Sequence, residues 1–283
     1  MNAGADARYL LLDVDGTLLT SGGEITARSR AALARAVDQG WTLVLASGRT
    51  YPSLWRVGAP LGLPFHAIAN AGAVGLAPGL ARVTYTNFLA PTLWPQIVRA
   101  LQAEGLSVIV FAHRHPEPPL FYVESPRGHP HFEAYLGRHR EAARTTPGLA
   151  EQAIADVVEV AALGSGPAFE KGSAQVLARF GDRSRNHSMV LFLSAQYGKI
   201  TEFFDAGTSK WHAFCGMFPE AARHPERVIA LGDEANDEEM IRTAGLGIAM
   251  GNATEALKAV ADRVTTDHDH EGVALALEPL LGP

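Results

Sequence analysis

The chain has 283 residues, of which 47% are hydrophobic and 19% charged, a composition that supports a packed core and excludes a disordered protein. Its formal net charge of −6 argues against a general nucleic-acid-binding protein, because such proteins carry a basic surface. The single cysteine, Cys215, excludes an intrachain disulfide and any zinc site built on several thiolates.

The N-terminal segment MNAGADARYL has no basic region followed by an apolar region, as a signal peptide would. No uninterrupted apolar run is long enough to span a bilayer. We therefore expect a cytoplasmic protein that has no membrane partner.

The first third of the chain alternates short apolar runs with helical patterns. The runs YLLLDVD, WTLVLAS and HAIANAG predict buried strands. Between them, TARSRAALARAVDQG and SLWRVGAPLG predict helices. Strands that are apolar throughout and alternate with helices indicate a parallel sheet covered on both faces.

The next stretch, residues 82–205, has a different character. The runs LSVIVFA and PLFYVES predict one hairpin, and SMVLFLSA with KITEFFDA predicts a second, joined by a short turn containing Gly198. The segments TLWPQIVRALQAEG and PAFEKGSAQVLARFG predict helices between them. Antiparallel strands with helices indicate an inserted α+β domain.

After residue 205 the strand–helix alternation returns. The expected elements are the strands RVIALGD, LGIAMGN and RVTTD and the helices EANDEEMIRTAG, ATEALKAVA and HEGVALALEPLL. The sequence therefore predicts an α/β fold with a Rossmann-like, doubly wound parallel sheet. Its core is discontinuous, residues 1–81 and 206–283, and carries the inserted α+β domain of residues 82–205.

Polar residues gather where the predicted core strands stop, which is where open α/β sheets bind ligands. These residues are Asp13, Asp15, Ser47, Gly48, Asn70, Asp233, Asn236 and Asp237. Lys210, in the segment TSKWHAF, stands at the start of a helix. If the sheet is parallel, all of them meet at one edge.

These side chains suit phosphoryl transfer. Crowded carboxylates repel one another unless a cation neutralises them, and Mg²⁺ prefers such oxygen ligands. A hydroxyl and an ammonium group can hold phosphoryl oxygens, and an aspartate can be the nucleophile. The expected chemistry is Mg²⁺-assisted phosphoryl transfer through an aspartyl-phosphate.

Four segments, DVDGTL, LASGR, SK and GDEAND, resemble in this order the four motifs of the haloacid dehalogenase (HAD) superfamily of phosphohydrolases. The tail from GLGIAMGN onward resembles the Cof-type subgroup. That subgroup carries a large C2-type cap as an insert between the second and third motifs. The resemblance covers the whole core, and the inserted stretch lies where the cap is expected.

The resemblance implies roles for the acidic residues. Asp13 would attack phosphorus, and Asp15 would act as general acid and base. The carboxylates of Asp13 and Asp233, with the backbone carbonyl of Asp15, would bind Mg²⁺. Asp237, the fourth residue assigned to the metal site, would hold a metal-bound water or Lys210.

The resemblance also implies a set of residues that bind the substrate. Ser47 and Lys210 would grip the phosphoryl group and so take part in catalysis. The full substrate-binding set is Ser47, Gly48, Asn70, Lys210 and Asn236. Lys210 precedes Trp211, where the subgroup usually has glycine, which implies a different backbone there. Because the third motif is short, Lys199 is an alternative to Lys210; we prefer Lys210 because it opens a helix, while Lys199 lies in a predicted hairpin of the insert.

Two features leave alternatives open. Arg49 pairs either with a carboxylate of the core or with the substrate. The run DHDH at residues 267–270 has the composition of a metal-binding tract, but a polar loop is the simpler interpretation.

We therefore expect a Mg²⁺-dependent phosphatase of a small phosphorylated metabolite, with a sugar phosphate as one candidate. The alternatives are a phosphotransferase or phosphomutase that uses the same intermediate, and a non-catalytic protein that binds a phosphorylated metabolite. No nucleic-acid partner is expected, and the sequence sets no oligomeric state.

Overall fold

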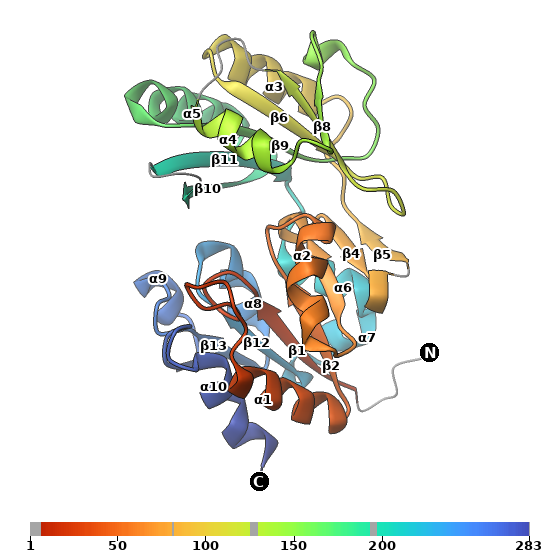
Figure 1. Cartoon of the computed structure of the whole chain (residues 1–283), viewed down its shortest axis with the longest axis vertical. Helices are drawn as coiled ribbons and strands as arrows, with labels where there is room; N and C mark the ends of the chain where they lie inside the picture. Colours follow the sequence, from red (N-terminus) through yellow and green to blue (C-terminus); the bar gives the residue numbers. More distant parts are fainter. Residues whose placement is uncertain (1–6, 81, 125–129, 193–196, 283) are drawn as a thin grey trace. The chain divides into compact units, whose positions relative to one another are not determined.

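The computed structural model describes residues 7–80, 82–124, 130–192 and 197–282 (Figure 1). The chain divides into two compact units, one formed by residues 1–86 and 209–283 and the other by residues 87–208. We call them the core unit and the inserted unit. No helix in the described ranges is long and apolar enough to cross a membrane.

An eight-stranded sheet, in the order β14-β13-β12-β1-β2-β3-β4-β5, forms the centre of the core unit. The pairs from β14 to β3 are parallel, whereas β4 is antiparallel to both β3 and β5. The strands are β1 (Arg8–Asp13), β2 (Trp41–Ala46), β3 (His66–Ala69), β4 (Val74–Leu76), β5 (Val83–Thr86), β12 (Val228–Gly232), β13 (Leu246–Ala249) and β14 (Arg263–Val264).

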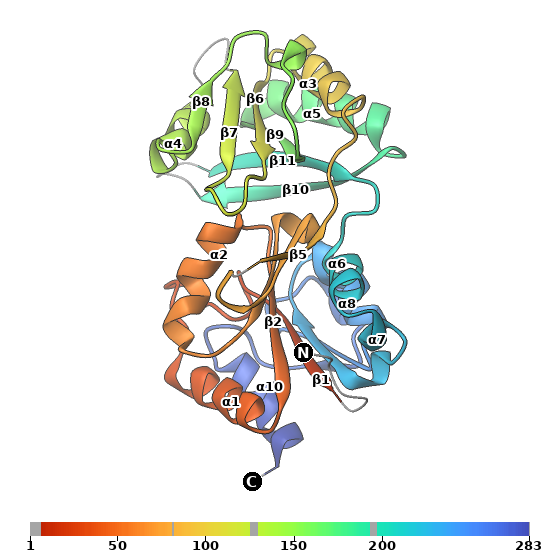
Figure 2. The same cartoon turned by 90° about the vertical axis from the view of Figure 1, so that its right-hand side faces the viewer.

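Helices cover both faces of this sheet. Figure 2 shows α1, α2 and α10 on one side of the strands and α6, α7 and α8 on the other. The helices are α1 (Ala27–Asp38), α2 (Tyr51–Gly58), α6 (Lys210–Met217), α7 (Pro219–Ala222), α8 (Glu238–Thr243), α9 (Glu255–Lys258) and α10 (Gly272–Leu281). The predicted α/β class, with a Rossmann-like parallel sheet, is confirmed.

The apolar runs explain why β1 lies in the middle of the sheet. Leu10, Leu11 and Leu12 are fully buried, as expected for a strand covered on both faces. In the parallel register Asp13 pairs with Ala46, and Leu12 pairs with Leu231. The carboxyl ends of β1, β2 and β12 therefore meet at one edge.

The inserted unit contains a six-stranded sheet in the order β10-β11-β9-β6-β7-β8, antiparallel except for the pair β7–β8. Its strands are β6 (Ser107–Ala112), β7 (Leu120–Glu124), β8 (Ala143–Thr145), β9 (Val157–Gly164), β10 (Ser184–Phe192) and β11 (Tyr197–Asp205). Its helices are α3 (Trp94–Ala103), α4 (Pro130–Arg138) and α5 (Gly166–Phe180). Ile97 and Leu101 of α3 and Phe169 of α5 belong to one buried apolar cluster with Val160 of β9 and Phe203 of β11.

Two details differ from the predicted insert. Its predicted bounds, 82–205, include Val83–Thr86, but this segment is β5 and pairs with β4 of the core sheet. Gly198, predicted in the turn of the second hairpin, pairs instead with Leu191 inside the β10–β11 ladder. Residues 193–196 of that hairpin lie outside the described residues.

A pair of buried carboxyl groups lies on the sheet of the inserted unit. Glu159 on β9 and Glu202 on β11 are both buried, and their side chains are hydrogen-bonded to each other. Burial raises the pKa of Glu202 to about 7, above its ordinary value of 4.5, and the hydrogen bond from Glu159 only partly offsets this. The folded inserted unit therefore holds a proton that the unfolded chain releases at lower pH.

We expect the inserted unit to lose stability as the pH rises. Because the folded pKa of Glu202 is the higher one, its stabilising contribution is complete below pH 4.5 and is lost as the pH passes 7. The loss should be about 3 kcal/mol, measured by amide hydrogen exchange of β9 and β11. Glu202→Gln should flatten this dependence of stability on pH, whereas Glu133→Gln, at an exposed position, should not. A wild-type stability that does not change with pH would contradict the assignment of the proton to Glu202.

Candidate active site

The loop that follows β1 holds two carboxylates in different surroundings. Asp13 is the last residue of β1 and is buried, whereas the side chain of Asp15 is 53% exposed. Gly16 makes the turn possible, because it has a φ of +80° and an added Cβ would lie 2.3 Å from Oδ2 of Asp233. The tight turn thus brings this loop against Asp233.

Lys210 occupies the centre of the buried site. It is the first residue of α6, whose N-cap Ser209 accepts a hydrogen bond from the backbone N–H of His212. Only 1% of its side chain is exposed, and its Nζ donates to Oδ1 of Asp13 and Oδ1 of Asp237, both at 2.5 Å. It is also 3.4 Å from Oδ1 of Asn236.

The alternative lysine, Lys199, lies elsewhere. It belongs to β11 of the inserted unit and forms an exposed ion pair of 2.7 Å with Glu170. Trp211, which follows Lys210, is buried and stacks on Phe214 at 5.3 Å, so the departure from glycine serves packing. The geometry therefore favours Lys210 as the lysine of the site.

Asp233 and Asp237 are fixed by backbone and side-chain donors. Oδ2 of Asp237 accepts from the backbone N–H groups of Asp233, at 3.0 Å, and Glu234, at 3.1 Å. Oδ1 of Asp233 accepts from the hydroxyl of Thr17 at 2.9 Å, and its Oδ2 lies 3.3 Å from Nδ2 of Asn252. Asp237 thus accepts hydrogen bonds from Lys210 and from the loop after β12.

Three buried carboxylates face one ammonium group at this point. Burial raises the pKa of Asp13 well above its ordinary value; Lys210 opposes this shift, while Asp237 and Asp233 add to it. Burial likewise raises the pKa of Asp233 to about 7, and the Asp237 carboxylate contributes. Burial would lower the pKa of Lys210, but Asp13 and Asp237 outweigh it and raise the pKa.

This excess of negative charge fits a hard divalent cation. Asp13, Asp233 and Asp237 each offer a carboxylate oxygen, and these atoms lie within 4.8 Å of one another. The carboxylate of Asp15 is not part of this group, so its assignment to the metal site rests on its backbone carbonyl. In the described part of the chain no second group of this kind is found.

Asp15 is held by Arg49 through two hydrogen bonds. Nε of Arg49 donates to Oδ2 at 2.7 Å and Nη2 to Oδ1 at 2.6 Å, the bidentate geometry of a strong guanidinium–carboxylate pair. The buried hydroxyl of Ser47 lies 3.3 Å from Oδ2 of Asp15. Of the two alternatives for Arg49, the structure shows the carboxylate of the core.

The remaining predicted residues lie beside Ser47 and Arg49. The backbone N–H of Asn70 donates to the carbonyl of Arg49 at 2.9 Å, and that of Ala71 donates to the carbonyl of Ser47 at 3.0 Å. Asn70 is buried and has a φ of +46°, which asparagine tolerates better than most residues. Gly48 lies between Ser47 and Arg49 and is partly exposed.

The site therefore has two connected parts. One contains Asp13, Lys210, Asp233, Asn236 and Asp237, and the other contains Asp15, Ser47, Gly48, Arg49 and Asn70. All of these residues belong to the core unit.

Sequence reasoning missed Asn252. Its Nδ2 donates to the carbonyl of Gly16 at 2.9 Å and reaches Asp233, so it ties the first loop to the last strands. A sequence signal for Asn252 exists, because it is a polar residue shortly after the end of β13, as the predicted site residues are after other strands. The Asn252 side chain also accepts from the backbone N–H of His268 at 3.1 Å.

The DHDH run forms a polar loop. Asp267 contacts Nδ1 of His270 at 2.7 Å, and Asp269 accepts from the backbone N–H of Ser21 at 2.8 Å. These carboxylates are occupied by protein donors, which supports the simpler interpretation of this segment.

Removal of the buried ammonium group should destabilise the core unit. Lys210→Met leaves Asp13 and Asp237 without their shared cation, and breaking a buried ion pair from one side costs about 3–5 kcal/mol. The free energy of unfolding in urea, measured in EDTA, should fall by this amount. Lys199→Met, which breaks the exposed pair with Glu170, should cost about 1 kcal/mol or less; equal losses in both variants would contradict the prediction.

The chain is similar to known proteins in both sequence and structure. The sequence profile described as haloacid dehalogenase-like hydrolase matches residues 10–277. A pyridoxal phosphate phosphatase of Escherichia coli, YbhA, is 27% identical over 94% of this chain and 96% of its own. The phosphatase YwpJ of Bacillus subtilis is 26% identical over 97% of this chain and 100% of its own.

A solved structure supports the same relationship. The haloacid dehalogenase-like hydrolase from Bacteroides thetaiotaomicron superposes with a TM-score of 0.77 at 26% identity. The match covers 97% of this chain and 99% of that one. The similarity therefore extends over both units.

Proposed function

The chain belongs to the haloacid dehalogenase-like hydrolase family and is a phosphoric monoester hydrolase, and from this premise we propose that it dephosphorylates a small metabolite through an aspartyl-phosphate on Asp13. The observation that carries the proposal is the contact of Lys210 with Asp13, at 2.5 Å and buried, beside a second aspartate held by Arg49. Such an arrangement pairs a nucleophile with a separate proton carrier.

In the first step, a carboxylate oxygen of Asp13 attacks phosphorus and the bond to the ester oxygen breaks. Asp15 gives its proton to that leaving oxygen, which departs as an alcohol. Lys210 and Ser47 hold the phosphoryl oxygens, whose charge grows as the bond breaks. Asp237 keeps the Lys210 ammonium in position through its 2.5 Å contact.

In the second step, water attacks the phosphorus of the aspartyl-phosphate, and the bond to Asp13 breaks. Asp15, now ionised, accepts the proton of the water. Inorganic phosphate leaves, and both aspartates return to their starting states. The bidentate contact with Arg49 orients Asp15 while it is ionised, the state in which it accepts the proton of the water.

The carboxylates of Asp13 and Asp233 and the backbone carbonyl of Asp15 would hold Mg²⁺. When bound, the ion supplies positive charge that offsets the three carboxylates and the phosphoryl oxygens. Thr17 and Asn252 orient Asp233 for this purpose through their hydrogen bonds to its two oxygens.

The substrate class is a small phosphorylated metabolite. The Escherichia coli relative is named a pyridoxal phosphate phosphatase, which supports pyridoxal phosphate as a first compound to test. Sugar phosphates, one candidate among small phosphorylated metabolites, are the second group. A panel should contain both groups, with p-nitrophenyl phosphate as a general reporter. It would distinguish an enzyme of narrow substrate specificity from one of broad specificity.

Chelation of divalent ions should remove the activity. In EDTA, phosphate release from the best ester of the panel should fall by about 100-fold or more, because the carboxylate cluster then repels the phosphate. Mg²⁺ should restore it, whereas an equal concentration of Ca²⁺, which takes more ligands at longer distances, should not. Full activity in EDTA would contradict the metal requirement.

A further inference from the structure

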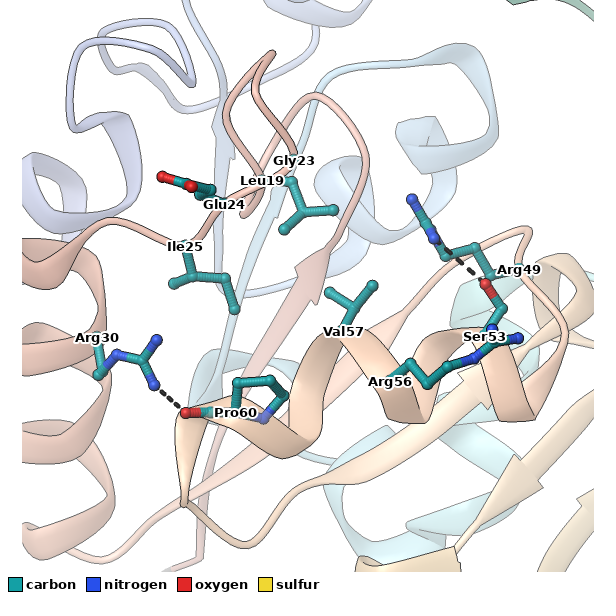
Figure 3. Close-up of a pocket in the computed structure, with 10 residues that line it drawn as sticks. All are labelled: Leu19, Gly23, Glu24, Ile25, Arg30, Arg49, Ser53, Arg56, Val57 and Pro60. Carbon is teal, nitrogen blue, oxygen red and sulfur yellow. Dashed lines mark hydrogen bonds between the residues drawn. The ribbon is translucent and has the colours of Figure 1, made fainter. Parts of the chain in front are cut away.

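A pocket of about 550 Å³ lies in the core unit between the loop that follows β1 and helix α2 (Figure 3). Its volume is in the range of small-molecule sites, roughly 300–1,000 Å³. Leu19, Ile25 and Val57 give it an apolar middle. Among its lining residues only Arg49 belongs to the site described above.

Three guanidinium groups stand at the two ends of this pocket. Figure 3 shows Arg30 at one end and Arg49 and Arg56 at the other, with the apolar side chains between them. Glu24 is the one carboxylate of the lining. A chain with a net charge of −6 thus concentrates cations at this place.

Arg30 and Arg56 keep their charge uncompensated. Arg30 donates to the carbonyl of Pro60, and Nε of Arg56 donates to the carbonyl of Pro52 at 3.3 Å. Neither forms an ion pair within the residues that the structure describes. By contrast, Arg28 on the same helix as Arg30 pairs with Glu278 at 2.6 Å.

Arg49 has donors left over for a ligand. Its Nε and Nη2 hold Asp15, and Nη1 contacts the hydroxyl of Ser53 at 3.2 Å. A guanidinium carries five N–H groups, so one hydrogen on Nη1 and one on Nη2 remain. These two hydrogens remain available to donate to a carboxylate or phosphate.

We propose that this pocket binds a small organic dianion, with one anionic group at each end of a short apolar segment. One group would lie at Arg49 and Arg56 and the other at Arg30, while the segment between them packs on Ile25 and Val57. The pocket adjoins the phosphoryl site at Arg49, and the proposal does not depend on the proposed hydrolysis.

The test is calorimetric titration of the full chain, in EDTA, with succinate, adipate and suberate. Binding should be saturable and should show one preferred chain length, because the ends of the pocket are fixed. Arg30→Gln and Arg56→Gln should each weaken binding by about tenfold or more, since each removes a charged hydrogen-bonding partner. Glu24→Gln should strengthen it, because a like charge is lost.

Arg28→Gln is the matched control, since Arg28 is an arginine of α1 that does not line the pocket, and it should bind as wild type does. Phosphate release by Arg56→Gln should equal that of wild type, which separates the pocket from catalysis. Absence of heat with all three dicarboxylates up to about 10 mM would overturn the proposal. Unchanged affinity in both Arg30→Gln and Arg56→Gln would overturn it as well.

Discussion

Replacement of Asp13 by asparagine is expected to abolish phosphate release, with kcat lower by about 10⁴-fold or more. An amide cannot form the acyl-phosphate bond, so neither step of the proposed reaction can take place. Lys210, whose ammonium donates to Oδ1 of Asp13, would still be able to hold the phosphoryl group.

The loss should come from chemistry and not from misfolding. A neutral amide has nearly the same shape as the Asp13 carboxylate, and it removes one of three buried carboxylates that repel one another. Asp13→Asn should therefore unfold within about 1 kcal/mol of wild type in urea, and Asp237 would remain as a partner of Lys210.

The measurement is acid quenching after reaction with a phosphate-labelled ester. Wild type should carry label that is released by hydroxylamine, as acyl-phosphates are, and Asp13→Asn should carry none. Asp38→Asn, an exposed carboxylate at the end of α1, is the control and should behave as wild type does. Turnover by Asp13→Asn above about one hundredth of the wild-type rate would exclude Asp13 as the nucleophile.

Replacement of Asp15 by asparagine is the second large effect, with kcat lower by about 10²–10⁴-fold, the usual contribution of a general acid–base group. An amide cannot exchange the proton that the leaving oxygen needs, nor take one from water. Arg49 also loses the carboxylate that its Nε and Nη2 grip, so the loop after β1 loses a charged contact.

The two aspartates can be told apart by the leaving group. With p-nitrophenyl phosphate, whose leaving oxygen needs little protonation, Asp15→Asn should still form the aspartyl-phosphate but hydrolyse it slowly. Labelled enzyme should therefore accumulate in Asp15→Asn and not in Asp13→Asn. The control is Asp269→Asn, which changes a partly exposed loop carboxylate bound to Ser21. Turnover of a sugar phosphate by Asp15→Asn at the wild-type rate would refute the role of Asp15 as general acid and base.

The periodic pattern of apolar residues predicted much of the fold. The apolar residues of β1, β2 and β12 are buried, so the strand character of these runs and their parallel arrangement were predictable. The membership of the short strand β5 in the core sheet was not, because its residues Val83–Thr86 favour a strand but do not indicate which sheet they join. Its place in the core sheet depends on pairing with β4, which no local pattern contains.

Open α/β sheets bind ligands where their parallel strands end, and this rule predicted most residues of the site but not all of them. It selected Asp13, Ser47, Asn70 and Asp233, which do lie at the ends of neighbouring strands. It would also have selected Asn252 after β13, had it been applied to the last strands. Arg49 was left with two possible partners, because both are compatible with its position in the loop.

By itself, the sequence determined the residue types, their order and the strand ends at which they stand. Only the tertiary structure decided the partners: Lys210 joins Asp13 across 197 positions of the chain, and Arg49 joins Asp15 across 34. The difference in burial between Asp13 and Asp15 was likewise decided there. The physical reason is that these contacts depend on the strand order β12-β1-β2-β3 and its parallel register, which form only when distant segments pair.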